Sequence, residues 1–425
     1  MKPRCFGKLT TAAFVLAAGF GTAQAEDIPV GHLATTSGET SRVAEIYGQG
    51  LVDAMAYINE HGGINGDRLA YESVDYGYDA LQAVATYADW RERIHPVVVL
   101  GWGTADTEAL VPFITEDEVV FISGSSSGHL TDPTGRSPHT EVPAPYNFFY
   151  GPSYSDACRG LVQWAAQDWR RTRGANTSTF LQDLTPPRFV HMGDNHPYPN
   201  SPREACADFA RDLGFEVLDP IRYALAPGDF RAHCEALRQS GADYVFLGNT
   251  SDSNVALVRD CARVGVNARF MTNIYGWDEL AIEDAGEAGN GMVWEVSAGT
   301  WNDTVPGMAL VREVSAMSDP DGELYRPVHY MRGVCTAFFM RDAMVAAADM
   351  EGGVTGPNIR AAFEQMQDHV PEGLEGVCLP STWTAEDHRG STEVVLYQSN
   401  YSFGQWAMDE IFSTNIPLRP DWLGW

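Results

Sequence analysis

The chain has 425 residues, of which 57 are acidic and 28 are basic, so its formal net charge is −29. Nucleic-acid phosphates and anionic lipid head groups are bound by clustered cations, so this composition excludes both classes of partner. Hydrophobic residues make up 44% of the chain, which excludes general disorder and is enough for two domains with their own cores.

Residues 1–25 have the pattern of a cleavable signal peptide. Three basic residues precede or border the apolar run TTAAFVLAAGFGTA, and the small residues Ala23 and Ala25 mark a cleavage site. We therefore expect an exported, periplasmic protein that begins at Glu26. Cleavage removes three positive charges, which changes the net charge from −29 to −32, and it removes both lysines. Lysine chemistry is thereby excluded, and no later segment is apolar for long enough to span a membrane.

Six cysteines follow the signal peptide, and an even number outside the cytoplasm indicates disulfide bonds. They are Cys158, Cys206, Cys234, Cys261, Cys335 and Cys378. The chain has no CxxC motif and no histidine at zinc-finger spacing, so we expect no metal site and no cofactor.

From residue 28 the sequence alternates between strand and helix patterns. A strand is predicted at 28–34 and an amphipathic helix at 42–63, where apolar residues share one helix face and two glycines end the pattern. The alternation continues through RLAYESVD, DALQAVATYADWRER, PVVVLG, TEALVPFIT and EVVFIS. Such alternation predicts a parallel sheet with helices on both faces.

A segment rich in proline, glycine, threonine and histidine, residues 128–147, interrupts the pattern, and a second alternation follows. Helices are predicted at SDACRGLVQWAAQDW, PREACADFARDLG, DFRAHCEALRQSG and SNVALVRDCARVG, and strands at RFVHMG, FEVLDPIRY, DYVFLG, RFMTNI and GMVWEV, the last a crossing strand. Two α/β units of similar size predict two lobes, each a doubly wound parallel sheet. In such sheets ligands bind at the carboxyl ends of the strands, so we expect a ligand in the cleft between the lobes.

The doubly wound arrangement also suggests how the cysteines pair. Two consecutive helices on one face of the second sheet carry Cys234 and Cys261, which should meet there. Cys158 and Cys206 would then lie on the other face. Cys335 and Cys378 remain as a third pair.

Five segments in fixed order carry a family resemblance: SGETSRVAEIYGQG, INEHGGINGDRL, ITEDEVVFISGSSSGHLT, GADYVFLGNTSDSNVALVRDCARVGVNARFM and AEDHRGSTEVVLYQ. Together they resemble the type I periplasmic solute-binding proteins of ABC transporters, in particular the leucine/isoleucine/valine-binding and amide-binding branch. The resemblance implies three crossing hinge segments near 147–151, 294–299 and 376–386. It further implies a division into an N-lobe and a C-lobe, namely 26–147 with 300–375, including the helix YMRGVCTAFFMRDAMVAAA, and 148–299 with 376–425.

The turn GWGTADTEA ends a buried strand and opens a helix, whose unpaired N–H groups and dipole attract an anion. Thr104 or Asp106 is expected to cap this helix. In the resembled family, this turn and the next one, SGSSSG, hold the ligand's carboxylate. By position, that role falls to Thr104, Ala105, Ser125 and Ser127.

Two further N-lobe residues are candidates at the cleft. Trp102 directly follows a strand end and is expected to be a stacking platform, with packing between the lobes as the alternative. Arg42 is the only cation near these turns. It pairs either with an anionic ligand or with Glu39 or Glu45 on the surface.

Three turns of the C-lobe, HMGDNHPYPNS, GNTSDS and TNIYGW, also follow strands. The resemblance implies an aromatic ligand contact at Tyr198, and Asn249 and Thr250 offer polar groups. Amino-acid binders of the family place a carboxylate for the ligand's ammonium where this chain has Ile274 and Tyr275, with Trp277 beyond. The missing carboxylate argues against an α-amino acid ligand, unless Asp252 serves instead of capping the following helix.

The sequence therefore predicts a monomeric, non-enzymatic protein that captures a small organic acid or amide, with an aromatic or apolar body, for the permease of an ABC importer. Two alternatives remain open: a branched-chain amino-acid binder, and a ligand-binding subunit for a membrane sensor. The segment GSSSG also matches the GxSxG motif of hydrolases. That motif needs a helix directly after it, which the following proline- and glycine-rich segment cannot form.

Overall fold

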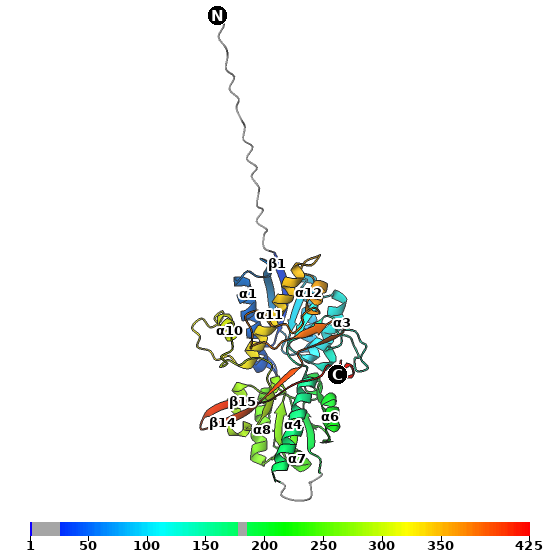
Figure 1. Ribbon diagram of the computed structural model, residues 1–425, viewed down its shortest axis with the longest axis vertical. Coiled ribbons are helices and arrows are strands. Elements are labelled where there is room, and N and C mark those ends of the chain that lie inside the picture. The colour runs from blue at the N-terminus through cyan, green and yellow to red at the C-terminus, as the bar shows by residue number, and fades with distance from the viewer. Residues whose placement is uncertain (2–25, 177–184) are drawn as a thin grey trace.

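A computed structural model describes, besides Met1, residues 26–176 and 185–425, so the expected signal peptide lies outside the described residues. Two α/β lobes lie one above the other (Figure 1). The first sheet is parallel throughout, in the order β2-β1-β3-β4-β5. Its strands are β1 (Asp27–Ala34), β2 (Arg68–Asp75), β3 (Val98–Gly101), β4 (Val120–Ser123) and β5 (Asn147–Phe149).

Helices cover both faces of this sheet, as the alternating pattern predicts. They are α1 (Ser41–Glu60), α2 (Ala80–Arg93), α3 (Thr104–Asp117), α10 (Met308–Ser315), α11 (Val328–Ala348) and α12 (Gly356–Phe363). Helix α11 returns from late in the chain and packs along α1. Two glycines allow this close approach, because a Cβ on Gly50 would lie 2.2 Å from the carbonyl oxygen of Tyr330, and one on Gly333 would lie 2.2 Å from that of Tyr47.

The second sheet has a parallel centre and an antiparallel edge, in the order β15-β14-β11-β10-β9-β6-β7, with β8 also paired to β6. The predicted strand FEVLDPIRY is wrong as one element: it forms two short strands, because Pro220 lacks an N–H and breaks the ladder. The long hairpin β14–β15 has no counterpart in the sequence prediction. The strands are β6 (Arg188–Gly193), β7 (Glu216–Val217), β8 (Ile221–Arg222), β9 (Tyr244–Leu247), β10 (Arg269–Thr272), β11 (Val293–Glu295), β14 (Glu393–Ser402) and β15 (Gln405–Asn415), and a separate pair is β12 (Thr382–Thr384) with β13 (Asp387–Gly390).

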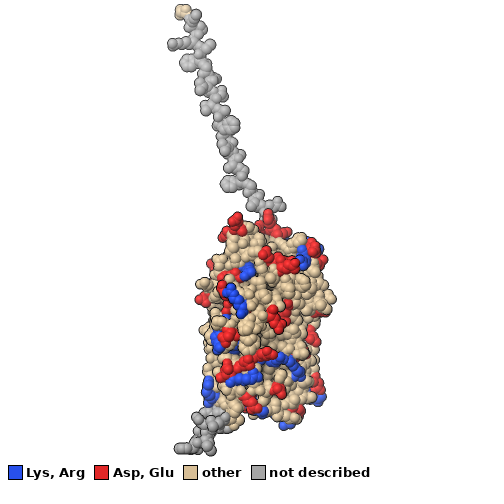
Figure 2. All heavy atoms as spheres, turned by 90° about the vertical axis from the view of Figure 1, so that its right-hand side faces the viewer, with Lys and Arg blue, Asp and Glu red and all other residues tan. Residues whose placement is uncertain are grey.

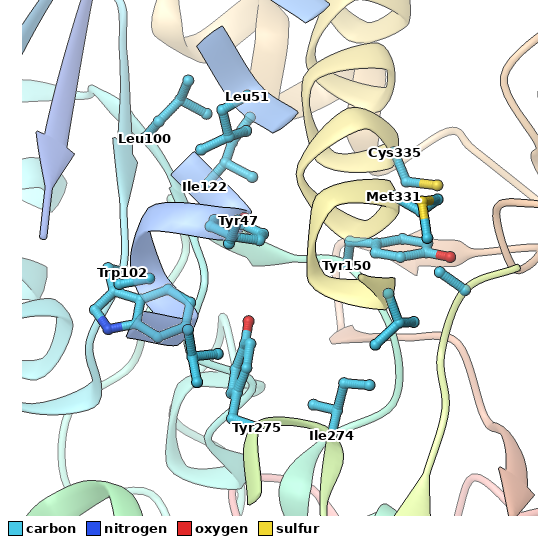
Figure 3. Packing of buried hydrophobic residues seen from close by; sticks show 14 of the residues in the cluster. Tyr47, Leu51, Leu100, Trp102, Ile122, Tyr150, Ile274, Tyr275, Met331 and Cys335 are labelled. Atoms are coloured by element: carbon cyan, nitrogen blue, oxygen red, sulfur yellow. The ribbon is translucent and has the colours of Figure 1, made fainter. Parts of the chain in front are cut away.

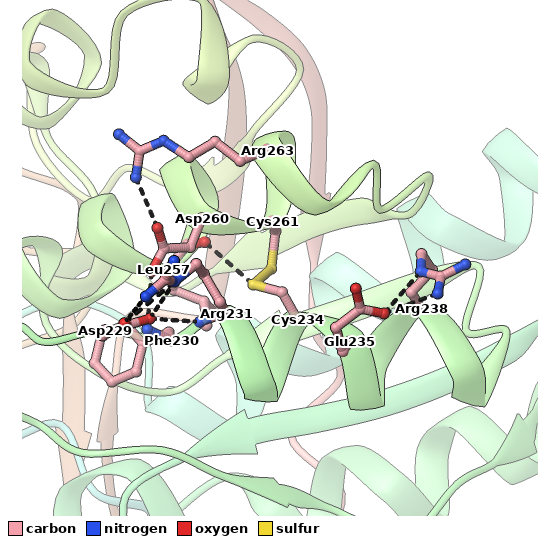
Figure 4. The surroundings of a disulfide bond; sticks show 10 residues. All are labelled: Asp229, Phe230, Arg231, Cys234, Glu235, Arg238, Leu257, Asp260, Cys261 and Arg263. Atoms are coloured by element: carbon pink, nitrogen blue, oxygen red, sulfur yellow. Dashed lines mark hydrogen bonds and ion pairs between the residues drawn. A yellow bond between two sulfur atoms is a disulfide. The ribbon is translucent and has the colours of Figure 1, made fainter.

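The helices of the second lobe form two groups, each closed by a disulfide bond. They are α4 (Tyr154–Asn176), α5 (Pro197–Asn200), α6 (Arg203–Asp212), α7 (Arg231–Ser240), α8 (Ser251–Val264) and α9 (Glu279–Ala285). Helices α4 and α6 pack in one hydrophobic cluster and are joined by Cys158–Cys206. Helices α7 and α8 pack in the other cluster and are joined by Cys234–Cys261 (Figure 4). Both predicted pairs are confirmed, since the helices of each pair share a face of the sheet.

The third predicted pair, Cys335–Cys378, is also formed. It joins α11 to the last of the segments expected to cross between the lobes. Beside it, one buried tyrosine connects all three of these segments. The hydroxyl of Tyr150 donates to the carbonyl oxygen of Ser297 (2.6 Å) and accepts from the N–H of Leu379 (2.7 Å). Its own carbonyl oxygen accepts from the Arg332 guanidinium of α11 at 3.1 Å.

We expect the double variant Cys234→Ala/Cys261→Ala to lose about 3 kcal/mol of unfolding free energy, because the bond no longer restricts the unfolded chain. Urea unfolding of the wild type and the variant measures this loss. Peptide mapping without reductant is the direct check on the pairing, and free thiols at both positions in the wild type would contradict it.

We expect Tyr150→Phe to lower the unfolding free energy by about 1–3 kcal/mol, because the buried N–H of Leu379 and carbonyl of Ser297 both lose their partner. The half-buried Tyr71, changed to Phe, is the matched control. Urea unfolding compares the two variants, and equal small losses would show that the hydroxyl of Tyr150 contributes nothing.

Candidate functional site

The carboxyl ends of the parallel strands in the two sheets face each other across the lobe boundary. Strand order reverses between β1 and β3 in the first sheet and between β6 and β9 in the second, and the loops that diverge at such switch points leave a crevice. A cavity of about 10 Å³ lies where the two crevices meet. It is lined by Thr40, Tyr78, Trp102, Gly103, Thr104, Tyr154, Tyr198, Thr250 and Tyr275.

Aromatic rings from both lobes form most of this lining. Trp102 of the first lobe and Tyr275 of the second meet edge to face, with ring centroids 4.6 Å apart and an interplanar angle of 64° (Figure 3). Tyr154 and Tyr198 meet in the same way at 5.3 Å. Such contacts contribute roughly 0.5–1.5 kcal/mol each beyond area burial. The Trp102–Tyr275 contact therefore stabilises the approach of the lobes, whereas Tyr154 and Tyr198 both belong to the second lobe.

The polar ends of these rings are held by the protein itself. The indole N–H of Trp102 donates to Oγ1 of Thr40 at 3.0 Å, and the hydroxyl of Tyr198 donates to Oδ1 of Asn273 at 2.9 Å. The hydroxyl of Tyr275 crosses the lobe boundary and donates to the carbonyl oxygen of Gly124 at 2.6 Å. Because the polar ends are occupied, the rings offer mainly apolar and π surface to a ligand.

Two threonine hydroxyls complete the lining. Oγ1 of Thr104 shares a hydrogen bond of 2.7 Å with Oγ of Ser125. Thr250 is the N-cap of the 14-residue helix α8, is only 3% exposed, and its Oγ1 has no hydrogen-bond partner among the described residues. A buried hydroxyl without a partner is costly, so Thr250 is a strong candidate for a ligand contact.

The start of α3 confirms Asp106 as a capping residue, although Thr104 is not the N-cap. Its N-cap is Gly103, whose N–H donates to a carboxylate oxygen of Asp106 (3.1 Å) and also lies 3.2 Å from the hydroxyl of Tyr76. Burial raises the pKa of Asp106 to about 6. The first turn of this helix thus already contains a buried carboxyl group, which occupies the place where the sequence pattern predicted an external anion.

The structure brings five of the predicted residues to the cavity: Trp102, Thr104, Tyr198, Thr250 and Tyr275. Ser125 supports Thr104, and Ser127 bonds Oγ to Oγ with Ser201 of the second lobe at 2.8 Å.

Besides Ser125, Ser127 and Arg42, three more predicted residues do not line the cavity. Ala105 lies one position further into α3. The amide of Asn249 bonds backbone groups, among them the N–H of Asp194 (2.8 Å) and the carbonyl of Ala224 (2.9 Å). Trp277 is fully buried in the hydrophobic core of the second lobe.

Arg42 forms neither of the interactions predicted from the sequence, with an anionic ligand or with Glu39 or Glu45. Its guanidinium pairs across the lobe boundary with Asp252 (2.7 Å) and Asp284 (2.5 Å). The side chains of Arg42 and Asp252 are each 31% exposed, and an ion pair exposed to that extent contributes roughly 0–1 kcal/mol to stability. It also occupies Asp252, the carboxylate that could have served an amino acid's ammonium.

Sequence reasoning missed four residues of the lining: Thr40, Tyr78, Gly103 and Tyr154. Tyr78 follows the carboxyl end of β2, so the strand-end rule that selected Trp102 could have found it. Thr40 precedes α1 and Tyr154 opens α4 after the first crossing segment. No local pattern marks either residue as facing the other lobe.

Carboxylates of the second lobe also contact the first lobe beside the cavity. Oε2 of Glu279 accepts from the N–H of Val328 at the start of α11 (3.1 Å), and the hydroxyl of Tyr325 lies 3.4 Å from Oε1. Oδ2 of Asp278 lies 3.2 Å from Nε2 of His329, and neither side chain is exposed. Burial raises the pKa of Glu279 to about 7, so ionisation of this carboxyl opposes the folded, closed arrangement near neutral pH.

The described residues around the GxSxG match lack the features of a hydrolase nucleophile. Ser126, the central serine of the GxSxG match, has no hydrogen-bonded base in the described part of the chain, and only the three-residue turn Gly128–Leu130 follows it. Across residues 26–176 and 185–425, no group of three or more His, Cys, Asp or Glu side chains is placed to hold a metal ion. No helix in these residues has the length and apolar character needed to cross a membrane.

The chain belongs to the periplasmic binding protein family, whose family model matches residues 27–405. A curated relative is the Leu/Ile/Val-binding protein homolog 4 of Brucella abortus, which is 23% identical over 273 residues. That match covers 60% of this chain and 58% of the relative, so less than two thirds of the relative's length is spanned.

Solved structures resemble the chain over nearly its whole length. An ABC transporter substrate binding protein from Aeropyrum pernix is 23% identical with a TM-score of 0.79, covering 94% of this chain and 98% of its own. A branched chain amino acid ABC transporter protein from Thermus thermophilus with bound valine is 20% identical with a TM-score of 0.76, covering 92% and 97%. A solute binding protein from R. palustris in complex with 4-hydroxybenzoate is 16% identical with a TM-score of 0.72, covering 93% and 99%. These similarities establish the two-lobed type I fold.

The raised pKa of Glu279 leads to a pH-dependent prediction. Its folded pKa of about 7 exceeds the ordinary value of 4.5, so the folded state binds the proton more tightly, and this group's contribution to stability falls as pH rises through that window. Glu279→Gln keeps an acceptor for Val328 and removes the ionisation. We expect the unfolding free energy of this variant to exceed that of the wild type by up to about 3 kcal/mol above neutral pH, and to equal it below about pH 4.

Urea unfolding across this pH range measures the difference between Glu279→Gln and the wild type. The exposed Glu283, changed to Gln, is the matched control. A stability difference that does not grow with pH would contradict the assigned burial effect.

Proposed function

We propose that this chain is an extracytoplasmic binding protein that captures a small organic acid or amide between its lobes and delivers it to the permease of an ABC importer. The observation that carries the proposal is the pairing of Trp102 and Tyr275 from opposite lobes over a cavity with threonine hydroxyls. A ligand at that place contacts both lobes at once, so its binding free energy favours the closed arrangement. Family membership supports binding and transport rather than catalysis.

The lining supports an acid or amide with an apolar or aromatic body. Rings on both sides suit a flat or apolar group, and the hydroxyls of Thr104 and Thr250 suit a carboxylate or carbonyl oxygen. A primary ammonium would need several acceptors, and Asp252 is already bound by Arg42. The second candidate is a branched-chain amino acid, which the names of the Brucella and Thermus proteins favour.

The charged surface of the chain limits the kinds of partner that it can bind. On the face in Figure 2, acidic side chains and arginines lie scattered among uncharged residues. This surface and the net charge of −29 suit a solvated, exported monomer and disfavour nucleic acid and anionic lipid as partners. A membrane sensor in place of a permease would use the same cleft and the same closure.

Calorimetry of the chain from Glu26 onward tests the ligand class with benzoate, aliphatic acids, their amides, leucine and valine. We expect an acid or amide to bind and Trp102→Ala to weaken it at least tenfold, because one wall of the cavity is lost. Trp406→Ala on the β14–β15 hairpin, a tryptophan that does not line the cavity, is the matched control. Micromolar binding of leucine that Asp252→Ala abolishes would overturn the choice of ligand in favour of an amino acid.

A further inference from the structure

We propose that the solute is an acid that also carries a fully methylated ammonium group, and that residues lining the cavity bind the two groups when the lobes part enough to widen it. This inference rests on the proposed function, and it replaces the neutral apolar body by a quaternary cation with an apolar surface. It depends on three features of the cavity: the charges around it, the chemistry of its rings and the hydroxyl left without a partner.

The first feature is a charge asymmetry across the cavity. None of the lining residues is a lysine or arginine, and both lysines of the chain precede Ala25. On the side of the first lobe, the buried carboxyl of Asp106 bonds the N–H of Gly103, and both Gly103 and Tyr78 belong to the lining. Near neutral pH this carboxyl gives the Trp102 side of the cavity a negative potential.

Two arginines lie near the cavity without changing the sign on that side. Arg332 lies against the ring of Tyr275, with its guanidinium carbon 4.6 Å from the ring centroid, so it occupies one face of that ring. It has Glu295 as a neighbouring charge. Arg42 is bound by Asp252 and Asp284. A ligand cation is therefore directed away from Tyr275 and toward Tyr78 and Trp102.

The second feature is the aromatic lining itself. Five of the nine lining residues are tyrosine or tryptophan, the ring types that attract cations most strongly through their π faces. A methylated ammonium has no N–H, so it needs no hydrogen-bond acceptor. That matters here, because Oγ1 of Thr40 and the carbonyl oxygen of Gly124 already accept bonds from Trp102 and Tyr275. A primary ammonium would lose its hydrogen bonds to water and regain few of them.

The third feature places the acid group at the second lobe. Thr250 lines the cavity and caps the 14-residue helix α8 without a hydrogen bond from its own side chain, and its buried Oγ1 has no partner in the described residues. The next hydroxyl, Oγ of Ser251, is also buried and without a partner there. A helix start with such hydroxyls suits a carboxylate, whereas the start of α3 is already occupied by Asp106.

A comparison of two isosteric acids on the wild-type protein tests the inference without any variant. N,N,N-trimethylglycine and 3,3-dimethylbutanoate share a carboxylate and have head groups of one shape, but only the first has a cationic head. By calorimetry near neutral pH, we expect the cationic acid to bind at least tenfold more tightly. Equal binding, or tighter binding of the neutral acid, overturns the inference and leaves the proposed acid ligand standing.

Choline tests the acid end, because it keeps the cation and lacks the carboxylate. We expect it to bind at least tenfold more weakly than N,N,N-trimethylglycine, and equal affinity would overturn the assignment of the carboxylate to α8. If neither isosteric acid binds and a free amino acid does, both the inference and the proposed ligand class fail.

Variants then assign the two ends. Tyr78→Phe keeps a π face and Tyr78→Leu removes it, so only the second should weaken binding of the cationic acid several-fold while leaving the neutral acid unchanged. Thr250→Val should weaken both acids alike. If Tyr78→Leu weakens both acids equally, the ring acts only as an apolar wall and the cation assignment is wrong. Circular dichroism of each variant confirms that it is folded.

Discussion

The hydrogen bonds of one buried tyrosine determine how the two sheets can face each other. Tyr150 connects the second and third crossing segments through its hydroxyl and α11 through its carbonyl oxygen. Cys335–Cys378 holds the same helix to the third segment. With these segments tied at one place, the lobes can separate at the cleft while the chain connections stay fixed, which is the geometry of a hinge.

On the cleft side, the contacts between the lobes are of two kinds, and their energies differ. The ring contacts and the hydroxyl of Tyr275 are buried and insensitive to salt. The pair of Arg42 with Asp252 is partly exposed, so salt screens it. The carboxyl of Glu279 is buried against the start of α11, and its raised pKa of about 7 leaves it only partly ionised at physiological pH. Closure therefore depends mainly on aromatic packing and on whatever the ligand adds to it.

The cavity shows how a general fold acquires a particular ligand preference. The positions at the strand ends follow from two doubly wound sheets whose switch points face each other. At those positions this chain has tyrosines and a tryptophan, together with a carboxyl of its own at the start of α3. Function thus lies in the site rather than in the fold.

The sequence by itself determined the two alternating α/β units, the pairing of the cysteines and the residues that end the strands, among them Trp102, Tyr198 and Tyr275. These features depend on local periodicity and on which helices share a sheet face, and both follow from the order of residues and elements in the sequence. Only the tertiary structure decided that Tyr154 and Thr40 line the cavity, that Trp277 is core, and that Arg42 serves the other lobe. Those outcomes depend on tertiary contacts, such as that between Arg42 and Asp252, which lie 210 positions apart, and no local pattern carries the relative placement of two lobes.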